Sequence, residues 1–363
     1  MKRSIVSLIR LPRFATAALV ALMLTTLALP NAHAVTIDMV TVGNAGNAND
    51  PATGGVYGGV AYEYQIGKCD VTIGQYTAFL NAVAKTDTYS LYNASMATDL
   101  NVAGISQTGV SGSYTYSVIN NGGDSSNRPI TYVSWWDSAR FANWMANGQP
   151  TGAQSSTTTE NGAYNVNGAT TGSAPGKNVT NPNTSASPTF YIPIENEWYK
   201  AAYYSPVKGG VGSPGYYAYA TQSDTAPGNM IGSGANQANY FAGAGYSVTQ
   251  SPEYSFQNYL TDVGAFTNSA SFYGTFDQSG NLSEWNDLTG AADSSRGVRG
   301  GGWVSSAFIL SSSLSDTTDP SNENASFGFR LASAVPVPEP STWVMAAAGI
   351  ACAGWALRRR KPA

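Results

Sequence analysis

Residues 277–285 read DQSGNLSEW, and this stretch decides how the rest of the chain is interpreted. Five further motifs surround it in a fixed order: YQIGKCDVT at 64–72 followed by Gln75-Tyr76, RPI at 128–130 leading to VSW at 133–135, IPIENEW at 192–198, RGGGW at 299–303 and GFR at 328–330. Each motif alone is a weak indication. Their combination in one order is a strong one, because chance would have to repeat itself at compatible spacings.

This ordered set of motifs resembles the formylglycine-generating enzyme family, also called the sulfatase-modifying factor family. The resemblance implies an irregular α+β fold related to C-type lectin domains, with few helices, short strands and many loops. We expect residues 35–334 to form this domain. Its length suits one loop-rich domain, and no repeat of 20 to 50 residues indicates a solenoid or propeller.

Local sequence patterns predict three helices within the domain. Each has an N-terminal cap or a proline before it and a spacing of apolar residues that buries one face. We expect the first from Thr72 through Val83, the second from Ser134 to about Asn147-Gly148, and the third after Pro193, ending before Pro206.

The remaining chain is predicted to be loops and short strands. Residues 149–188 contain mostly Thr, Ser, Asn and Gly, which favours a surface loop. An aromatic run broken by glycine, Gly215-Tyr216-Tyr217-Ala218-Tyr219, suits a short irregular strand.

The first 34 residues are typical of a secretory signal peptide. A basic start precedes an apolar run at 15–29, and the triplet Ala32-His33-Ala34 predicts cleavage by signal peptidase after Ala34. The alternative is an uncleaved membrane anchor, but the apolar run is short for a membrane span. We therefore expect an exported protein.

The C-terminal segment, residues 335–363, has its own pattern. Pro338-Glu339-Pro340 precedes an apolar stretch at 341–357, long enough to span a membrane, and a basic cluster at 358–361. This pattern resembles the PEP-CTERM sorting signal of Gram-negative bacteria. The resemblance implies transient anchoring, processing by an exosortase, and delivery to the cell surface or an extracellular matrix. The alternative is an ordinary tail anchor.

Charge and residue counts exclude several functions. Between residues 35 and 334 the chain has ten basic and 21 acidic residues, which opposes nucleic-acid binding. The only histidine is His33, inside the predicted signal peptide, so the mature chain lacks a histidine for a catalytic triad or a zinc or iron site. Of the two cysteines, Cys352 lies in the apolar tail and Cys69 is expected to be a small core residue.

A calcium site is predicted in the central motif. Asp277 and Glu284 are separated by a glycine-containing segment, and calcium prefers six to eight oxygen ligands in flexible geometry. The resemblance implies as ligands the two carboxylates and the carbonyls of Gly280 and Leu282, although the family usually has asparagine at the position of Asp277. The alternative for the two acids is a solvated loop beside a buried Trp285.

The resemblance also implies a second calcium site, which would begin at Asn239-Tyr240. Its second half falls at residues 253–256, where the match is poor.

Active members of the family oxidise a cysteine of sulfatases, using two cysteines that bind Cu(I). Counted from the RGGGW motif, these positions fall at Ser305 and Leu310, and neither is a soft ligand, so we do not expect copper. A related iron-dependent enzyme uses histidine, which the mature chain lacks. Glu195 and Glu197 could act as acid and base, but two acids at the start of a helix are explained by the helix dipole.

Two hypotheses of function follow from these observations. The first is an exported, non-catalytic binding or structural module, stabilised by calcium, for a polysaccharide or a surface protein. The alternative is a diverged formylglycine-generating oxidase that acts on sulfatase cysteines with a different metal arrangement. The fold alone does not separate them, because function resides in the site.

Overall fold

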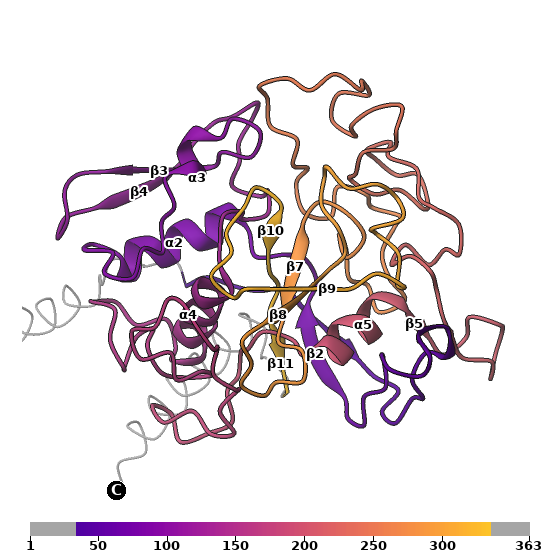
Figure 1. Cartoon of the computed structure of the whole chain (residues 1–363), viewed down its shortest axis with the longest axis horizontal. Helices are drawn as coiled ribbons and strands as arrows, with labels where there is room; N and C mark the ends of the chain where they lie inside the picture. The colour runs from indigo at the N-terminus through magenta and orange to yellow at the C-terminus, as the bar shows by residue number, and fades with distance from the viewer. Residues whose placement is uncertain (1–33, 335–363) are drawn as a thin grey trace, which may run out of the picture. The chain divides into compact units, whose positions relative to one another are not determined.

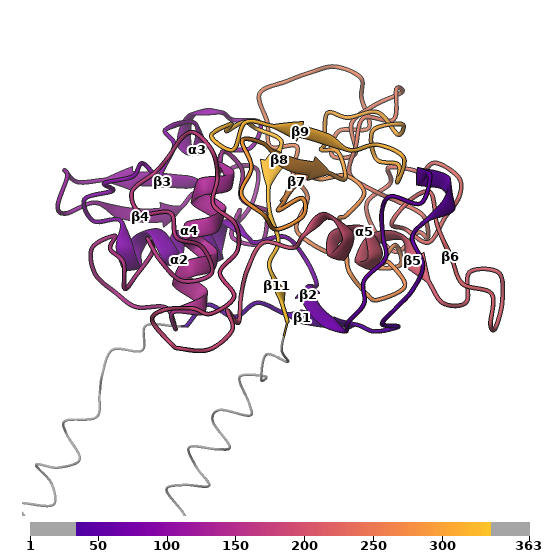
Figure 2. The same ribbon diagram turned by 60° about the horizontal axis from the view of Figure 1, so that its bottom comes forward.

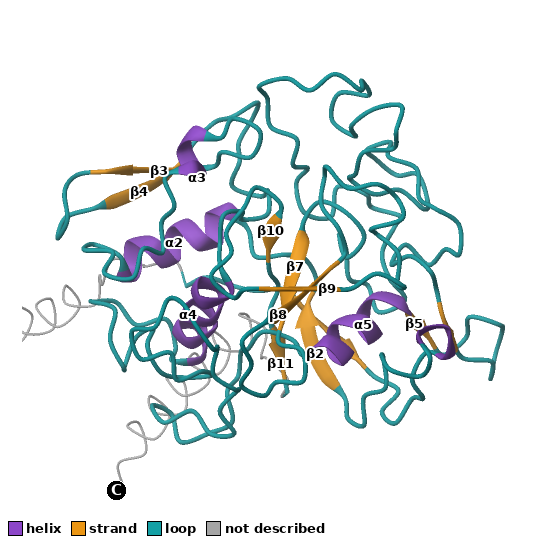
Figure 3. Cartoon of the chain, in the orientation of Figure 1, coloured by secondary structure: helices purple, strands orange, loops and turns teal. Residues whose placement is uncertain are grey.

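Short strands, four helices and long loops make up the part of the chain that this computed structural model describes, residues 34–334 (Figures 1 and 3). In chain order the elements are β1 Met39–Val42, the 3-10 helix η1 Pro51–Thr53, β2 Tyr64–Gly67, α2 Ile73–Val83, α3 Ser95–Thr98, β3 Ile105–Thr108, β4 Thr115–Val118, α4 Trp135–Ala146, α5 Glu195–Tyr203, β5 Tyr204–Ser205, β6 Gly215–Tyr216, β7 Ser283–Asn286, β8 Arg296–Arg299, β9 Asp316–Thr318, β10 Phe327–Gly328 and β11 Ala332–Ser333.

The predicted signal peptide and the predicted sorting signal, with its span at 341–357, lie outside the described residues. Among residues 34–334, no helix combines the length and hydropathy needed to cross a membrane. The few helices, short strands and many loops confirm the predicted irregular α+β fold.

Four small sheets organise the described residues. A four-stranded sheet has the order β10-β7-β8-β9, and a three-stranded sheet has the order β1-β2-β11. β3 pairs with β4 and β5 pairs with β6 as separate antiparallel pairs. In Figures 1 and 2, α2 and α4 lie to one side of the central strands β7 and β8, and α5 lies to the other. The DQSGNLSEW motif therefore runs into the middle of the domain.

The three predicted helices are confirmed, and their start residues follow from capping. Thr72 caps α2 through a capping box with Gln75, and Ser134 caps α4 through a capping box with Asp137. α5 begins at Glu195, directly after the predicted Pro193-Ile194. The predicted strand at 215–219 is shorter than expected, because only Gly215 and Tyr216 pair with a neighbour.

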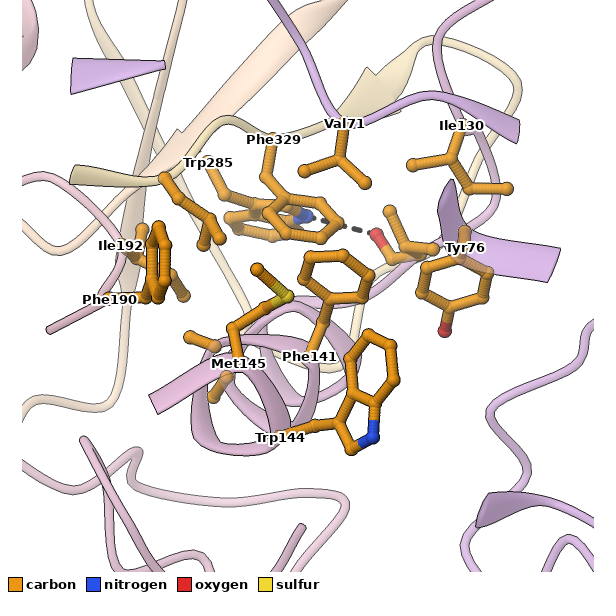
Figure 4. Close-up of a cluster of buried hydrophobic side chains, with 14 of the residues drawn as sticks. Val71, Tyr76, Ile130, Phe141, Trp144, Met145, Phe190, Ile192, Trp285 and Phe329 are labelled. Carbon is orange, nitrogen blue, oxygen red and sulfur yellow. Dashed lines mark hydrogen bonds between the residues drawn. The ribbon is translucent and has the colours of Figure 1, made fainter. Parts of the chain in front are cut away.

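The main core forms around α4, whose residues are buried on every side. The ring centroids of Phe141 and Phe329 lie 5.4 Å apart, and Trp285 donates a hydrogen bond from Nε1 to the carbonyl of Val133 at 2.9 Å (Figure 4). Ring pairs of this kind stabilise a core beyond the apolar area they bury. The motifs at 133–135, 280–285 and 328–330 are thus joined in one core.

The prediction of a surface loop at residues 149–188 was wrong in one respect. The segment forms no helix or strand, but several of its side chains are buried. Glu160 forms an ion pair with Arg140 of α4 at 2.8 Å, and Tyr164 donates a hydrogen bond to Asp287 at 3.1 Å. The physical reason is that buried polar side chains of α4 need hydrogen-bond or ion-pair partners. Residues 149–188 supply these partners.

Candidate functional site

Glu284 lies on β7 and is fully buried, so the alternative of a solvated loop is wrong for this residue. Its Oε2 and Oε1 atoms accept hydrogen bonds from Arg330 at 2.5 and 2.7 Å. Trp198 of α5 donates from Nε1 to Oε2 at 2.8 Å. Glu284 therefore joins the central sheet to α5 and to the GFR motif through a buried, bidentate ion pair.

Arg330 extends this cluster to the first sequence motif. It donates to Oδ1 of Asp70 at 3.1 Å and to the carbonyls of Gly67 and Phe276 at 3.0 and 2.8 Å. Sequence reasoning missed the role of Asp70, although a signal was present. Charged residues are rarely fully buried without a partner, so an acid and an arginine inside two apolar motifs could have been paired with one another.

Asp277 lies beside this cluster in the loop before β7. Its Oδ2 accepts a hydrogen bond from the backbone N–H of Gly264 at 2.7 Å, and its φ angle is 64°. Burial raises the pKa of Asp277 to about 6, against the hydrogen bond from Gly264 and the charge of Arg330, which lower it. The loop therefore presents a carboxylate that resists ionisation and would favour a nearby cation.

The fit of a calcium ion to the predicted ligands is mixed. Three carboxylates, Asp70, Asp277 and Glu284, face the single guanidinium of Arg330, so their charge suits an added cation. Glu284, however, already gives both oxygens to Arg330. Within residues 34–334, no three or more His, Cys, Asp or Glu side chains are grouped so that they could hold a metal. Asp277 is thus the acid best placed to bind calcium.

The carbonyl of Gly280 is less available than predicted, whereas no hydrogen bond to the carbonyl of Leu282 is found within residues 34–334. The carbonyl of Gly280 accepts a hydrogen bond from the N–H of Leu282 at 2.8 Å. Gly280 itself is required by close packing, because its φ angle is 97° and a Cβ there would lie 2.4 Å from the carbonyl oxygen of Asn239.

Asn239, from a distant part of the chain, packs against this central loop. Its side chain donates to Oδ1 of Asn281 at 2.9 Å, and its carbonyl accepts from the N–H of Asn281 at 2.8 Å. Tyr240 is buried and donates its hydroxyl to the carbonyl of Pro227, while Glu253 is exposed. The structure thus brings Asn239 to the first predicted site, and the second calcium site stays a prediction.

Ser305 and Leu310, which were predicted to stand at the family's cysteine positions, lie against the same glycine. A Cβ on Gly301 would lie 3.3 Å from Cβ of Ser305 and 2.9 Å from Cδ1 of Leu310. Ser305 accepts a hydrogen bond at Oγ from the N–H of Gly302 at 3.0 Å, and Leu310 is fully buried. The two positions are neighbours in space, but they carry a hydroxyl and an alkyl group, which are poor ligands for Cu(I).

An aromatic cluster adjoins Ser305. Trp303 stacks on Tyr259 with ring centroids 4.9 Å apart and on Tyr254 at 6.2 Å, with interplanar angles of 4° and 14°. Phe241 donates its backbone N–H to the carbonyl of Ser305 at 3.0 Å. The segment around residue 241 and the loop that begins at Trp303 are therefore held together.

Large apolar side chains are exposed on the segment that contains Tyr254 and on the loop that begins at Trp303. We define the apolar face as the exposed side chains of Tyr254, Phe256, Val304, Phe308 and Ile309. Phe256 is 86% exposed, Phe308 65% and Tyr254 58%. Residues 254–261 and 300–315, which contain the five side chains, include no Asp, Glu, Lys or Arg, and the exposed acid Glu253 directly precedes the first stretch. Tyr254 stacks on Trp303, the residue before Val304, so the two stretches meet at this point. Exposed apolar patches mark interaction sites in soluble proteins.

Cys69 does not replace the missing thiolates. It was predicted to be a core residue, and it is half-buried, lining a surface hollow together with Asp70. Burial, followed by the charge of Asp277, raises the pKa of the Cys69 thiol to about 12. The thiol is therefore protonated at neutral pH, whereas metal binding needs the thiolate.

The two acids of α5 have structural partners. Glu195 pairs with Arg299 of β8 at 2.7 Å. Glu197 closes the start of the helix by accepting the N–H of Ile194 at 2.9 Å, and it accepts the hydroxyl of Tyr191 at 2.8 Å. These contacts occupy both carboxylates and hold α5 against the central sheet.

Comparisons with known proteins give matches to two sequence models and to several solved structures. Residues 336–361 match the PEP-CTERM protein-sorting motif, which indicates a bacterial protein exported to the cell surface and processed by an exosortase. No curated protein matches the chain.

Three solved structures are similar to the chain. CarF is 19% identical, with 83% of this chain and 99% of CarF covered and a TM-score of 0.42. The Treponema denticola variable protein 1 is 16% identical, with coverages of 84% and 97% and a TM-score of 0.45. PvdO from Pseudomonas aeruginosa is 15% identical, with coverages of 82% and 92% and a TM-score of 0.39.

The sequence of residues 41–335 matches the family described as the sulfatase-modifying factor enzyme 1-like domain. This match spans most of the chain and includes all six motifs around DQSGNLSEW. The chain therefore belongs to the sulfatase-modifying factor family.

Proposed function

We propose that this exported domain is a non-catalytic binding module that docks a protein of the cell surface through its apolar face. The observation that carries the proposal is the surroundings of Ser305 and Leu310. At the positions where active relatives hold copper, this chain has a hydroxyl, an alkyl group and exposed rings.

The absence of catalysis follows from ligand chemistry. Cu(I) is held by soft donors, and the Oγ of Ser305 is a hard oxygen that already accepts a hydrogen bond from Gly302. The thiol of Cys69 is held protonated by burial. The described residues therefore offer copper no pair of thiolates, which counts against the alternative of a diverged oxidase.

A protein partner is favoured by the composition of the apolar face. The centres of protein interfaces are depleted of charged residues and enriched in aromatic ones. The apolar face combines Phe and Tyr with the aliphatic Val304 and Ile309, and the charged residue Glu253 directly adjoins it on the Tyr254 side. Burying such side chains is worth about 1.5–3 kcal/mol for each that becomes fully covered.

Binding to cells of the producing bacterium tests this proposal. We expect the labelled, purified protein to bind intact cells, and we expect the double variant Phe256→Ser and Phe308→Ser to bind at least tenfold more weakly, because two exposed rings are lost. Treating the cells with protease beforehand should remove the binding. The matched control is Val179→Ser, which changes a side chain that is 87% exposed and lies outside the apolar face.

Two results would contradict the docking proposal. Equal binding by the wild type and the double variant would exclude the apolar face as the contact surface. Binding that survives protease treatment would show that the partner on the cell is not a protein and would favour a polysaccharide instead.

We also propose that one calcium ion stabilises the domain at Asp277, where three carboxylates face one guanidinium. At a free calcium concentration of about 100 Kd, binding adds about 2.7 kcal/mol to stability, which raises the Tm of a domain of this size by about 5 °C. We expect this rise in the wild type and not in Asp277→Ala. Metal analysis of the same samples should find no stoichiometric copper.

Melting temperature and metal content together distinguish calcium binding from copper binding. Equal melting temperatures in calcium and in chelator would remove the calcium assignment. Copper bound at one ion per chain, together with oxidation of a sulfatase-derived cysteine peptide, would favour the alternative of a diverged oxidase.

A further inference from the structure

A hollow of about 560 Å3 opens beside the start of α4. It is formed by four segments that are distant in the sequence, at residues 88–90, 134–137, 168–171 and 321–323. Its walls carry six aliphatic hydroxyl groups, those of Thr88, Ser90, Ser134, Thr170, Thr171 and Ser321. None of these segments belongs to the apolar face, so the hollow is a separate feature of the molecule.

Most of these hydroxyls are available to a ligand. Ser134 donates to Asp137 at 2.6 Å and Ser321 donates to Asp319 at 2.6 Å. The side chains of Thr88, Thr170 and Thr171 make no hydrogen bond with the rest of the described chain. Each free hydroxyl can donate one hydrogen bond and accept others.

Two carboxylates line the hollow, and each has one oxygen that accepts no hydrogen bond from the described residues. Asp137 is 3% exposed, and its Oδ2 accepts from the N–H and the hydroxyl of Ser134 at 2.9 and 2.6 Å. Glu323 is half-buried, and its Oε2 accepts from Asn93 at 2.6 Å. Within residues 34–334, nothing donates a hydrogen bond to Oδ1 of Asp137 or to Oε1 of Glu323.

The two acids also influence one another. Burial, followed by the charge of Glu323, raises the pKa of Asp137 to about 7. Near neutral pH the carboxyl group of Asp137 is therefore protonated in part of the molecules. An ionised carboxylate accepts hydrogen bonds, and a protonated carboxyl group can also donate one through its O–H.

The positive charge near the hollow is already neutralised. The guanidinium of Arg140 lies 4.6 Å from the ring centroid of Tyr89, which lines the hollow. Arg140 donates its Nε and Nη2 hydrogens to Glu160 at 2.8 and 2.9 Å. The hollow thus has two acids and no unpaired base among its lining residues, which disfavours an anionic ligand.

We propose that this hollow binds a neutral sugar unit. A sugar has several hydroxyls on a small ring. The hydroxyls and the two carboxylate oxygens that line the hollow can form hydrogen bonds with them. Hydrogen bonds to an ionised acceptor are about twice as strong as neutral ones. The volume lies within the range of small-molecule sites. A domain that docks a surface protein would then also hold a neutral polysaccharide.

The test uses the purified, full-length exported protein and defined sugars. Methyl glycosides of glucose, galactose and mannose, and methyl glucuronide as the anionic counterpart, are titrated up to about 50 mM, which detects sites weaker than a Kd of 1 mM. Binding is followed by saturation-transfer NMR. We expect at least one neutral glycoside to bind and the glucuronide not to bind.

The site is located by the double variant Glu323→Gln and Thr171→Val, which leaves the cap of α4 intact. We expect it to weaken neutral sugar binding at least tenfold, because one charged acceptor and one hydroxyl are lost. The control is Phe256→Ser with Phe308→Ser, which should bind the sugar as well as the wild type does. The control also distinguishes this inference from the docking proposal, because the Phe256→Ser, Phe308→Ser variant should lose binding to cells and keep binding to the sugar.

Three outcomes would overturn the inference. The first is that no neutral glycoside binds. The second is that one binds equally well to wild type and to the Glu323→Gln, Thr171→Val variant. The third is that the hollow binds calcium and no sugar, seen as a calcium signal that is lost in Glu323→Gln and retained in Asp277→Ala.

Discussion

Replacing Glu284 by glutamine is expected to lower the free energy of unfolding by about 3–5 kcal/mol. The change removes the bidentate carboxylate partner of the fully buried Arg330 and leaves Asp70, at 3.1 Å, as its remaining acid. The hydrogen bond from Trp198 to a charged oxygen is also weakened. Urea denaturation at pH 7 measures the effect. Chelator is present throughout, so that calcium binding does not contribute to the difference.

An exposed ion pair provides the control for this experiment. Lys208 and Asp224 lie 2.8 Å apart, but their side chains are 25% and 57% exposed, so Asp224→Asn should cost less than about 1 kcal/mol. If Glu284→Gln also costs less than 1 kcal/mol, the buried ion pair does not form in solution. The same pair of proteins is then compared in calcium without chelator, and a loss that is larger in calcium than in chelator would mean that Glu284 also binds calcium.

Replacing Glu160 by alanine is expected to destabilise the domain by a similar amount, about 3–5 kcal/mol. Arg140 is fully buried in α4, and Glu160 is its only acidic partner in the described chain. The N–H of Gly168 also loses its acceptor, Oε2 of Glu160, which it meets at 2.8 Å. Urea denaturation measures the loss, and limited proteolysis should cut residues 149–188 faster in the variant.

Val179 provides the control within the same segment. It is 87% exposed, so Val179→Ser should change the free energy of unfolding by less than about 0.5 kcal/mol. A small effect of Glu160→Ala, with unchanged proteolysis, would mean that residues 149–188 form a surface loop after all.

The helices were predictable because their signals are local. Thr72 and Ser134 each cap a helix through a residue three positions later, so the signal and the structure it produces lie within one turn of chain. The short strands were less predictable. β6 pairs only two residues, and where a strand ends depends on its neighbour in the sheet, which the local pattern does not contain.

In the candidate sites, too, some features were predictable from the sequence and others were not. Ser305 and Leu310 were located by counting from a motif, and the structure places both against Gly301. The partner of Glu284 was not predicted. Arg330 lies 46 residues away in the sequence and Asp70 lies 260 residues from Arg330, and nothing local indicates which acid a buried arginine will meet.

Polar composition misled the sequence analysis at residues 149–188. A stretch of Thr, Ser, Asn and Gly is most often solvated, and the rule that predicts a loop from it does not consider buried groups elsewhere. Asn143 of α4 donates to the carbonyls of Thr159 and Tyr164 at 2.7 and 2.9 Å. The need to satisfy buried polar groups on α4 brought this segment into the interior.

The sequence by itself determined the family, the helix starts and the presence of Ser305 and Leu310, not cysteine, at the positions counted from the RGGGW motif. Each of these depends on residue identity at short or fixed spacing. Only the tertiary structure decided that Glu284 pairs with Arg330, that Glu160 is buried, and that four distant segments enclose one hydroxyl-lined hollow. A charge that is buried away from water must pair with another buried group. The packing of the whole domain decides which distant side chain becomes that partner.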